Sequence, residues 1–265
     1  MWGTAAASYR WIVTDTAAAL PPVVSREQWR AARKALLIKE KALTRARDEL
    51  NAERRRLPMV RIANDYIFEG PTGPARLLDL FDGHAQLIVG HFMFDPEWDE
   101  GCPSRSAGAD EFSAGHLSHL LARSTSFAYV SRAPYRKIEA YRAKKGWTVP
   151  WYSSFGSDFN YDFHVTIDES VTPAEYNFRT RAEHEQANTA SYLQGPQPFE
   201  LNGLSCFLRV DDDVFHTYSL YARGTETVGG AYYFLDLTAL GRQEDWEEPA
   251  GRARYARSAN PNFSA

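Results

Sequence analysis

The stretch that decides the fold is QLIVGHFMFDPEWDEGCPSRSAGADEFSAGHLSHLLA, residues 86–122. Residues 87–94 form a short and nearly unbroken apolar run, which is typical of a strand buried on both faces. Asp95 and Pro96 then predict a turn. Cys102 follows in a Gly-Cys-Pro-Ser segment, and apolar residues recur beyond it at helical spacing, at positions 109, 112, 117, 120 and 121. The sequence therefore predicts a strand, a loop and a helix that begins at a cysteine.

A cysteine at a helix start has a definite chemical consequence. The unpaired N–H groups and the dipole of the first turn favour a thiolate, and Pro103 stands where a helix tolerates proline best. We expect Cys102 to be a redox-type cysteine, helped by Arg105 one turn further on. The alternative is a relic cysteine without a redox role, since free cysteines are commonly buried and inert. The Gly-Cys-Pro-Ser context argues against a core position.

The composition is that of an ordinary globular protein. Of 265 residues, 44% are hydrophobic and 24% charged, and the net charge of −4 gives no reason to expect nucleic acid. No apolar run approaches the ~18 residues of a membrane span, and the apolar piece near the start is too short for a secretion signal. Two cysteines are no disulfide framework. We therefore expect a cytoplasmic protein with no cofactor, no nucleic-acid partner and no membrane partner.

Residues 25–57 predict one long helix. Ser25 and Gln28 fit a capping box, Pro58 stops the helix, and an apolar residue recurs at every seventh position: Trp29, Leu36, Leu43, Leu50 and Leu57. The segment holds eleven Lys and Arg against five Asp and Glu, so the rest of the chain carries −10. We expect this helix to pack along its own domain or to act as an arm over a dimer partner. Interleaved acids and the lack of an aromatic platform disfavour a phosphate-binding surface.

The segments around the cysteine complete an alternating pattern. Residues 126–131 predict a second buried strand, and residues 134–145 predict an amphipathic helix that ends at Gly146. Strand, helix, strand and helix over residues 86–146 indicate a βαβ unit with parallel strands.

The second half of the chain gives weaker signals. Residues 147–163 are an aromatic-rich irregular stretch, of the kind that is more often functional than neutral. Residues 166–203 predict a surface excursion with a helical piece around 180–190. Residues 204–210 and 214–221 predict a hairpin about three aspartates, and residues 231–237 predict a strand or a helix.

Five segments carry a family resemblance: VVSREQWRAARKALLIKEKALTRARDELNAERRRLP at 23–58, HFMFDPEWDEGCPS at 91–104, VSRAPYRKIEAYRAKKGW at 130–147, PWYSSFGSDFNYDF at 150–163 and HTYSLYARG at 216–224. They resemble the DUF899 family, a thioredoxin-like bacterial family of unknown function. The resemblance implies a three-layer α/β fold with a mixed central sheet and a cysteine at the start of the first core helix. We expect an extension at 1–24, the long helix at 25–58, a thioredoxin-like domain at 59–245 and a tail at 246–265.

One departure from the family pattern bears on the chemistry. Family members usually read CPSC followed by aromatic residues, whereas this chain has Arg105 at the second cysteine position and Ala107 and Gly108 after it. A dithiol–disulfide cycle within this motif is therefore impossible. The small residues should open space for a ligand beside the cysteine.

The expected site joins Cys102, as the catalytic residue, to supporting residues from four segments. They are Trp98, Asp99, Pro103, Ser104, Arg105, Trp151, Ser153, Ser154, Ser205 and Cys206. Trp151, Ser153 and Ser154 are expected to form a pocket wall. Cys206 reads as a small core residue. In thioredoxin-like folds, however, the strand entering after the long insert passes close to the reactive cysteine, usually with a cis-proline. Residues 204–206 stand in that region without proline, which makes a disulfide with Cys102 conceivable.

The histidines and clustered acids give no metal site. His116 and His119 lie three apart, which is a weak ligand pair and more typical of a solvated face. His91 and His216 are expected to be hydrogen-bonded core histidines, and an approach of either ring to the cysteine is the alternative. Asp158, Asn160 and Asp162 alternate as in a calcium loop, but Phe163 stands where such a loop needs glycine. We expect no metal.

Two functions from different classes follow. The first is a thiol oxidoreductase or thiol-dependent peroxidase that acts on a small-molecule or thiol substrate through Cys102 alone, forming a sulfenic acid or a mixed disulfide. The second is a redox-silent protein with a ligand-binding or specialised non-redox role in the cleft beside Cys102. A homodimer built through residues 25–57 is a third, weaker hypothesis.

Overall fold

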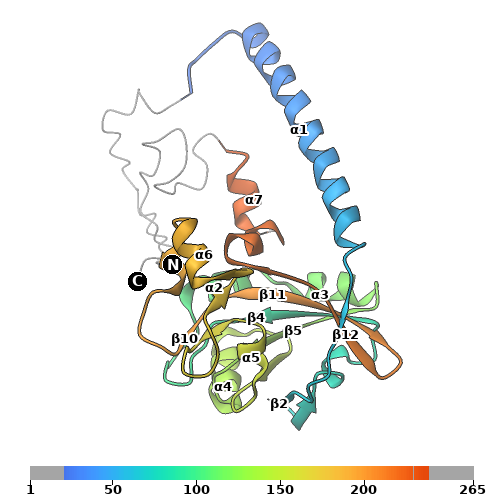
Figure 1. Ribbon diagram of the computed structural model, residues 1–265. Coiled ribbons are helices and arrows are strands. Elements are labelled where there is room, and N and C mark those ends of the chain that lie inside the picture. Colours follow the sequence, from blue (N-terminus) through green and yellow to red (C-terminus); the bar gives the residue numbers. More distant parts are fainter. Residues whose placement is uncertain (1–20, 229, 239–265) are drawn as a thin grey trace, which may run out of the picture. The chain divides into compact units, whose positions relative to one another are not determined.

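The computed structural model describes residues 21–228 and 230–238 (Figure 1). These residues fall into two units, one of residues 21–43 with 231–238 and one of residues 44–228 with Gly230. The division falls inside the first helix. The predicted domain boundaries stay predictions, and the predicted tail from residue 246 lies outside the described residues, as does most of the predicted extension.

Helix α1 (Arg26–Arg54) begins as the sequence predicts. The Gln28 N–H donates to Ser25 Oγ at 3.2 Å and the Ser25 N–H donates to Gln28 Oε1 at 3.0 Å, which confirms the capping box. No residue of α1 is buried. Trp29 is 51% exposed and Leu43 is 64% exposed. Whether this seam packs along its own domain or over a partner therefore stays a prediction.

The second unit is built on an eight-stranded mixed sheet. Across the sheet the strands run in the order β1 (Val60–Arg61), β12 (Asp213–Tyr221), β11 (Gly203–Val210), β4 (Gln86–His91), β5 (Thr125–Ser131), β6 (Trp151–Ser153), β2 (Ile67–Gly70) and β3 (Gly73–Arg76). Strands β4, β5 and β6 are parallel, and every other neighbouring pair is antiparallel. Parallel strands joined by helices, with an antiparallel hairpin beside the first of them, are the thioredoxin-like arrangement. The predicted fold class is confirmed.

The connection from β4 to β5 holds two helices, where the sequence predicts one. They are α2 (Pro103–Asp110) and α3 (Ala114–Leu121). The break arises because Ser113 caps α3: the His116 N–H donates to Ser113 Oγ and the Ser113 N–H donates to His116 Nδ1. Helix α4 (Tyr135–Lys145) joins β5 to β6 and ends at Gly146, whose φ of 69° is left-handed as predicted.

The stretches that the sequence leaves irregular contain short elements. Residues 147–163 include β6 and helix α5 (Phe159–Asp162). The insert between α5 and β11 includes β7 (Thr166–Ile167), β8 (Glu175–Tyr176), β9 (Arg179–Thr180), α6 (Arg181–Gln186), η2 (Ala190–Leu193) and β10 (Phe199–Glu200). This insert buries its own apolar cluster around Val165, Ile167, Tyr176 and Leu193, so it is more than a surface excursion. The remaining elements are η1 (Asp79–Phe81), η3 (Ala222–Val228) and α7 (Ala231–Leu235).

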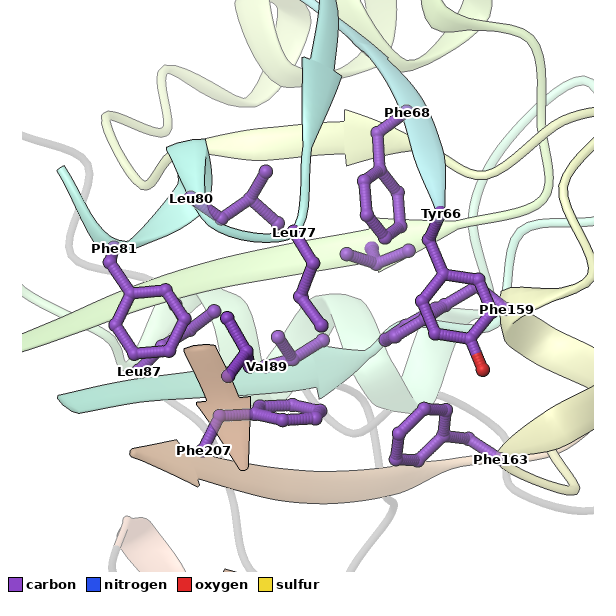
Figure 2. Packing of buried hydrophobic residues seen from close by; sticks show 12 residues of the cluster. Tyr66, Phe68, Leu77, Leu80, Phe81, Leu87, Val89, Phe159, Phe163 and Phe207 are labelled. Atoms are coloured by element: carbon purple, nitrogen blue, oxygen red, sulfur yellow. The ribbon is translucent and has the colours of Figure 1, made fainter. Parts of the chain in front are cut away.

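Both faces of the sheet are packed. On one face Leu87 and Val89 of β4 and Phe207 of β11 pack in one cluster with Phe81, with Phe159 of α5 and with Phe163 directly after α5 (Figure 2). On the other face a second apolar cluster joins the sheet to α2 and α4, through Phe92, Phe94, Ala109, Ile138, Tyr141 and Trp151. The alternation of side chains along each strand places these sets on opposite faces. The sheet is therefore the middle of three layers.

Candidate functional site

Cys102 lies at the carboxyl edge of the parallel strands. The chain continues past β4, turns at residues 95–98 and returns, so that the Cys102 N–H donates to the Met93 carbonyl at 2.9 Å. The carboxyl edge is where open α/β sheets place their ligands. The strand and loop thus deliver the cysteine to the place that the sequence predicts.

A glycine and a serine fix the loop and the first turn of α2. A Cβ at Gly101 would lie 2.5 Å from Phe92 Cε1 and 3.1 Å from Tyr141 Cε1, so the loop passes too close to these rings for any side chain. Ser106 Oγ donates to the Cys102 carbonyl at 2.9 Å and lies 2.8 Å from the Tyr141 hydroxyl. Because Tyr141 belongs to α4, these contacts hold the start of α2 against α4.

Cys102 is the N-cap residue of α2, with Pro103 at the first helical position, and it is partly exposed. Its Sγ lies 3.3 Å from Ser104 Oγ, and Arg105 Nε donates to the same oxygen at 3.3 Å. Because Ser104 Oγ accepts from the guanidinium, its own hydrogen is free to point at the sulfur. A negative sulfur here would face both the helix start and a hydroxyl bonded to a cation.

Arg105 also joins α2 to η3. Its Nη1 donates to Thr225 Oγ1 at 3.4 Å. The same oxygen accepts from Asn202 Nδ2 at 3.2 Å and donates to the Ala222 carbonyl at 2.8 Å. Sequence reasoning missed Thr225 and Asn202, because no spacing pattern marks a contact between residues 120 positions apart.

The acidic loop before the cysteine is exposed. Trp98 is 37% exposed, and its carbonyl accepts from Lys137 Nζ at 3.0 Å. Glu100 forms an ion pair with Lys144, and the hydrogen bond from that lysine lowers the pKa of the carboxyl. Asp99 is exposed. The charge of Glu100 is therefore engaged away from the sulfur.

The three residues predicted to form a pocket wall are buried and satisfied instead. Trp151 is 1% exposed, and its Nε1 donates to Ser131 Oγ at 2.9 Å. Ser153 Oγ donates to the Ala133 carbonyl at 2.6 Å, and Ser154 Oγ donates to Asn160 Oδ1 at 2.8 Å. Trp151 and Ser153 belong to β6, and Ser154 follows it. This strand of three residues is too short for the alternation of its side chains to be recognised in the sequence. Their role as a pocket wall stays a prediction.

Cys206 and Cys102 are both free. Cys206 lies opposite Ile88 of β4, whereas the Cys102 N–H donates to the carbonyl of Met93, two residues beyond the end of β4. The two cysteines therefore lie at different levels of the sheet. Burial raises the pKa of the Cys206 thiol to about 11. Cys206 is therefore not a disulfide partner in this conformation.

Ser205 belongs to a buried chain of hydrogen bonds. His91 Nε2 lies 2.7 Å from Ser205 Oγ, Ser205 Oγ lies 2.7 Å from Ser219 Oγ, and His216 Nε2 lies 2.7 Å from Ser219 Oγ. Burial, with a contribution from the charge of His216, lowers the pKa of His91 to about 3. Both histidines are hydrogen-bonded, as the sequence predicts; His91 is buried and His216 is half-buried.

The residues of the two weaker metal-like patterns have other partners in the structure. His116 caps α3. Asn160 is buried and bonds Ser154 and Glu200, whereas Asp162 accepts from the Tyr66 hydroxyl at 2.6 Å. Within the part of the chain that the structure describes, no three residues of ligand type gather as a metal site would require.

Sequence reasoning also missed a buried ion cluster at the same edge of the sheet. Arg132, directly after β5, donates to Glu200 Oε1 at 2.7 Å and to Asp95 Oδ2 at 2.5 Å. The Glu200 side chain is 1% exposed, and Thr166 Oγ1 donates to it at 2.9 Å. Burial raises the pKa of Glu200, against the opposing effect of Arg132. The cluster joins the insert to the sheet beside the cysteine loop.

A cavity of about 380 Å³ lies away from Cys102. Asn64, Tyr66 and Asp162 line it and bond one another: Asp162 Oδ2 accepts from Asn64 Nδ2 at 2.8 Å and from the Tyr66 hydroxyl. Gly108, by contrast, has open space where a Cβ would lie, but the cavity does not include it.

The sequence profile of a family described as "Bacterial protein of unknown function (DUF899)" matches residues 18–260. The chain belongs to this family. The DUF899 resemblance read from the motifs is thus confirmed. No curated protein matches the chain.

Several solved structures are similar to this DUF899 chain. Peroxidoxin BcpB from Mycobacterium tuberculosis is 13% identical, and the match covers 64% of this chain and 92% of that chain with a TM-score of 0.42. Peroxiredoxin Q from Xanthomonas campestris is 11% identical, with 64% and 91% covered and a TM-score of 0.43. Peroxiredoxin 6 of Arenicola marina is 10% identical, with 67% and 70% covered and a TM-score of 0.39. Likenesses this distant carry no argument about the chemistry of the chain. None of the described helices is long and apolar enough to cross a membrane.

Proposed function

We propose that the protein is a thiol-dependent oxidoreductase of the peroxidase type that uses Cys102 alone. The observation that carries this proposal is the chain of contacts from Arg105 Nε through Ser104 Oγ to Cys102 Sγ at the start of α2. A partly exposed sulfur beside a helix start and a cation-bound hydroxyl has the surroundings of a reactive cysteine rather than of a structural one.

The proposed reaction oxidises the sulfur and then returns it to the thiol. The Cys102 thiolate attacks one oxygen of a hydroperoxide, so that an S–O bond forms and the O–O bond breaks. The alcohol leaves with a proton, and Cys102 becomes a sulfenic acid. A small external thiol condenses with the sulfenic acid to give a mixed disulfide and water. A second thiol then displaces Cys102 and takes the first thiol into a disulfide.

The external thiol is required because the chain offers no internal one. Arg105 stands at the second cysteine position of the motif. Cys206 pairs with Ile88 in the middle of β4, and burial raises the pKa of its thiol, which therefore stays protonated at neutral pH. A compartment that holds reduced small thiols supplies such a reductant, and we place the protein in the cytoplasm for this reason.

Sulfenate trapping tests the proposal. Purified protein is treated with mild peroxide in the presence of a sulfenate-specific probe, and the labelled peptide is identified by mass spectrometry. We expect labelling at Cys102 that is lost in Cys102→Ser and kept in Cys206→Ser, which is the matched control. Equal labelling of all three proteins would remove the function.

A second candidate function is the binding of a small polar molecule in the cavity at Asn64, Tyr66 and Asp162. Its volume of about 380 Å³ and its hydrogen-bonding lining favour this function over the predicted cleft beside Cys102. Bound ligand raises the melting temperature. Thermal shift with sugars and small dicarboxylates tests it: a shift that survives Cys102→Ser but is lost in Asp162→Ala supports binding, and no shift with any of these probes removes it.

A further inference from the structure

Arg105 is a half-buried cation whose hydrogen-bond partners are all neutral. Its Nε donates to Ser104 Oγ and its Nη1 donates to Thr225 Oγ1. Among the described residues, no carboxylate forms an ion pair with its guanidinium. A charge that is partly withdrawn from water is costly unless a charge of opposite sign meets it. Arg105 therefore has the surroundings of a cation that an anion from outside the chain can pair with.

The acids on the two elements that Arg105 joins are paired with other cations. Asp110 of α2 lies 3.6 Å from Lys145 Nζ, and Glu226 of η3 lies 3.4 Å from Arg223 Nε. Neither carboxylate forms an ion pair with Arg105. The guanidinium therefore stays uncompensated on the side of α2 and on the side of η3.

The charge of Arg105 acts on the interior of the domain. Burial raises the pKa of Tyr129 on β5 and of Tyr176 on β8, and the positive charge of Arg105 opposes that rise in both. Tyr129 belongs to the sheet and Tyr176 to the insert. The guanidinium is therefore close enough to both for its charge to be felt there, where water screens a charge less than at the surface.

Thr225 fixes the direction in which the free donors of Arg105 point. Its hydroxyl accepts from Arg105 Nη1 and from Asn202 Nδ2 and donates to a backbone carbonyl, which uses all that a threonine hydroxyl offers. On the other side, the Nε–H points to Ser104 Oγ, which lies 3.3 Å from Cys102 Sγ. Nη2 stands on the same edge of the planar guanidinium as Nε. Its hydrogens have no acceptor among the described residues, so a free donor remains on the edge nearest the sulfur.

We propose that Arg105 receives the carboxylate of the small molecule that reacts with Cys102, so that the site selects substrates with a carboxylate a few atoms from the reacting oxygen or sulfur. One guanidinium edge matches the charge and the planar shape of one carboxylate. Nη2 donates to that carboxylate, while Nε and Nη1 keep their bonds within the chain. This inference rests on the proposed reaction at Cys102 and adds to it the class of substrate.

Two alkylating reagents of different charge test the selection without peroxide. Iodoacetate and iodoacetamide both form an S–C bond with the Cys102 thiolate and release iodide, but only iodoacetate carries a carboxylate. Because both react with the same thiolate, the ratio of their rates does not depend on the pKa of the thiol. The rates at Cys102 are followed by peptide mass spectrometry, with a blocked cysteine in the same solution as the reference thiol.

We expect the iodoacetate-to-iodoacetamide ratio at Cys102 to exceed that of the reference thiol by about fivefold or more. Arg105→Gln should bring the ratio down to that of the reference. Arg136→Gln, the matched control at an exposed arginine of α4, should leave it unchanged. A wild-type ratio no higher than the reference overturns the proposal, and this measurement needs no variant to fold. An unchanged ratio in Arg105→Gln, or an equal fall in Arg136→Gln, overturns it as well.

Two variants of Thr225 test whether its hydroxyl positions Arg105. Thr225→Val keeps the shape of the side chain but removes the hydroxyl, whereas Thr225→Ser keeps the hydroxyl. We expect the ratio to fall in Thr225→Val and to be kept in Thr225→Ser. A ratio in Thr225→Val equal to that of the wild type overturns the positioning role.

The two halves of the proposed cycle show where the carboxylate comes from. In the sulfenate assay a hydroperoxide that carries a carboxylate is compared with tert-butyl hydroperoxide, and 3-mercaptopropionate is compared with 2-mercaptoethanol as the reducing thiol. We expect the carboxylate-bearing reagent to react faster in one half, and this preference to be lost in Arg105→Gln. Sulfenate formation without a preference in either half overturns the selection and leaves the proposed function. An alkylation preference without any sulfenate removes the proposed function and leaves anion recognition by Arg105.

Discussion

Replacing Arg132 with methionine tests whether the buried ion cluster holds the insert to the sheet. Methionine keeps much of the side-chain length but removes both hydrogen bonds, so it leaves the Glu200 carboxylate, 1% exposed, without its cation. Removing one partner of a buried ion pair costs about 3–5 kcal/mol. For a chain of this size that loss lowers the melting temperature by roughly 6–20 °C.

The loss should depend on pH. Burial holds the pKa of Glu200 above its unfolded value, so its favourable contribution is complete below the unfolded pKa, near about 4.3, and is lost as the pH rises through the folded pKa. Without Arg132 the pKa of Glu200 rises further, so the pH range over which this stability is lost extends to higher pH. The stability of Arg132→Met should therefore fall faster with pH than that of the wild type, by up to about 1.4 kcal/mol per pH unit. Asp95, which raises the pKa of Glu200, acts in the same direction in both proteins.

Urea unfolding at several pH values between about 4.5 and 7.5 measures this difference. The control is Arg132→Met combined with Glu200→Gln, where the amide keeps the contact with Thr166 but carries no charge. We expect the double variant to recover stability relative to Arg132→Met at neutral pH and to lose the extra pH dependence. A cost for Arg132→Met that is constant over the whole range, or a double variant no more stable than the single one, would refute the reasoning.

Three further predictions concern the cysteine loop and its surroundings. Gly101→Ala should destabilise the protein by about 1–3 kcal/mol in urea unfolding, because its Cβ would lie 2.5 Å from Phe92 Cε1; an unchanged midpoint would show that the loop yields freely. Phe94→Ala, at a side chain with 0% exposure, should cost about 3–5 kcal/mol by the same assay, and a loss below about 1 kcal/mol would contradict its place in the core. Iodoacetamide at about pH 8 should alkylate Cys102 well before Cys206, since a pKa near 11 leaves only about one part in a thousand of Cys206 as thiolate. Peptide mass spectrometry would show the order, and earlier labelling of Cys206 would contradict it.

The fold was predictable where an element is long enough to repeat its pattern. Strands β4 and β5 were predicted from their nearly unbroken apolar runs. Helix α4 was predicted from its amphipathic pattern and from the glycine at its end, Gly146. Strand β6 was missed because three residues hold barely one alternation, and its place is set by pairing Tyr129 with Trp151. The split of the cysteine helix was missed for a local reason, since the Ser113 cap interrupts an apolar spacing that reads as continuous.

Only the local part of the candidate site, formed by residues close together in the sequence, was predictable. A cysteine followed by proline at a helix start is a local pattern, and the structure has it at Cys102. The contacts of Arg105 with Thr225 and of Arg132 with Glu200 join residues 120 and 68 positions apart. Such contacts depend on strand order and on the course of the insert, which no local spacing encodes. Trp151 was assigned to a wall for the same reason: its burial depends on the neighbours that the fold brings to it.

Arg105, at the position where the family resemblance expects a second cysteine, supplies a positive charge beside the motif. Arg105 uses two different nitrogens, Nε toward Ser104 and Nη1 toward Thr225, so its guanidinium is held between the cysteine and η3. A lysine has one nitrogen on a flexible stem and cannot span both acceptors in this geometry. If Cys102 reacts as proposed, Arg105→Lys should therefore weaken its activation while a positive charge is retained. A loss of reactivity in Arg105→Lys would show that position 105 requires the two hydrogen bonds of a guanidinium, which a cysteine at this position cannot donate.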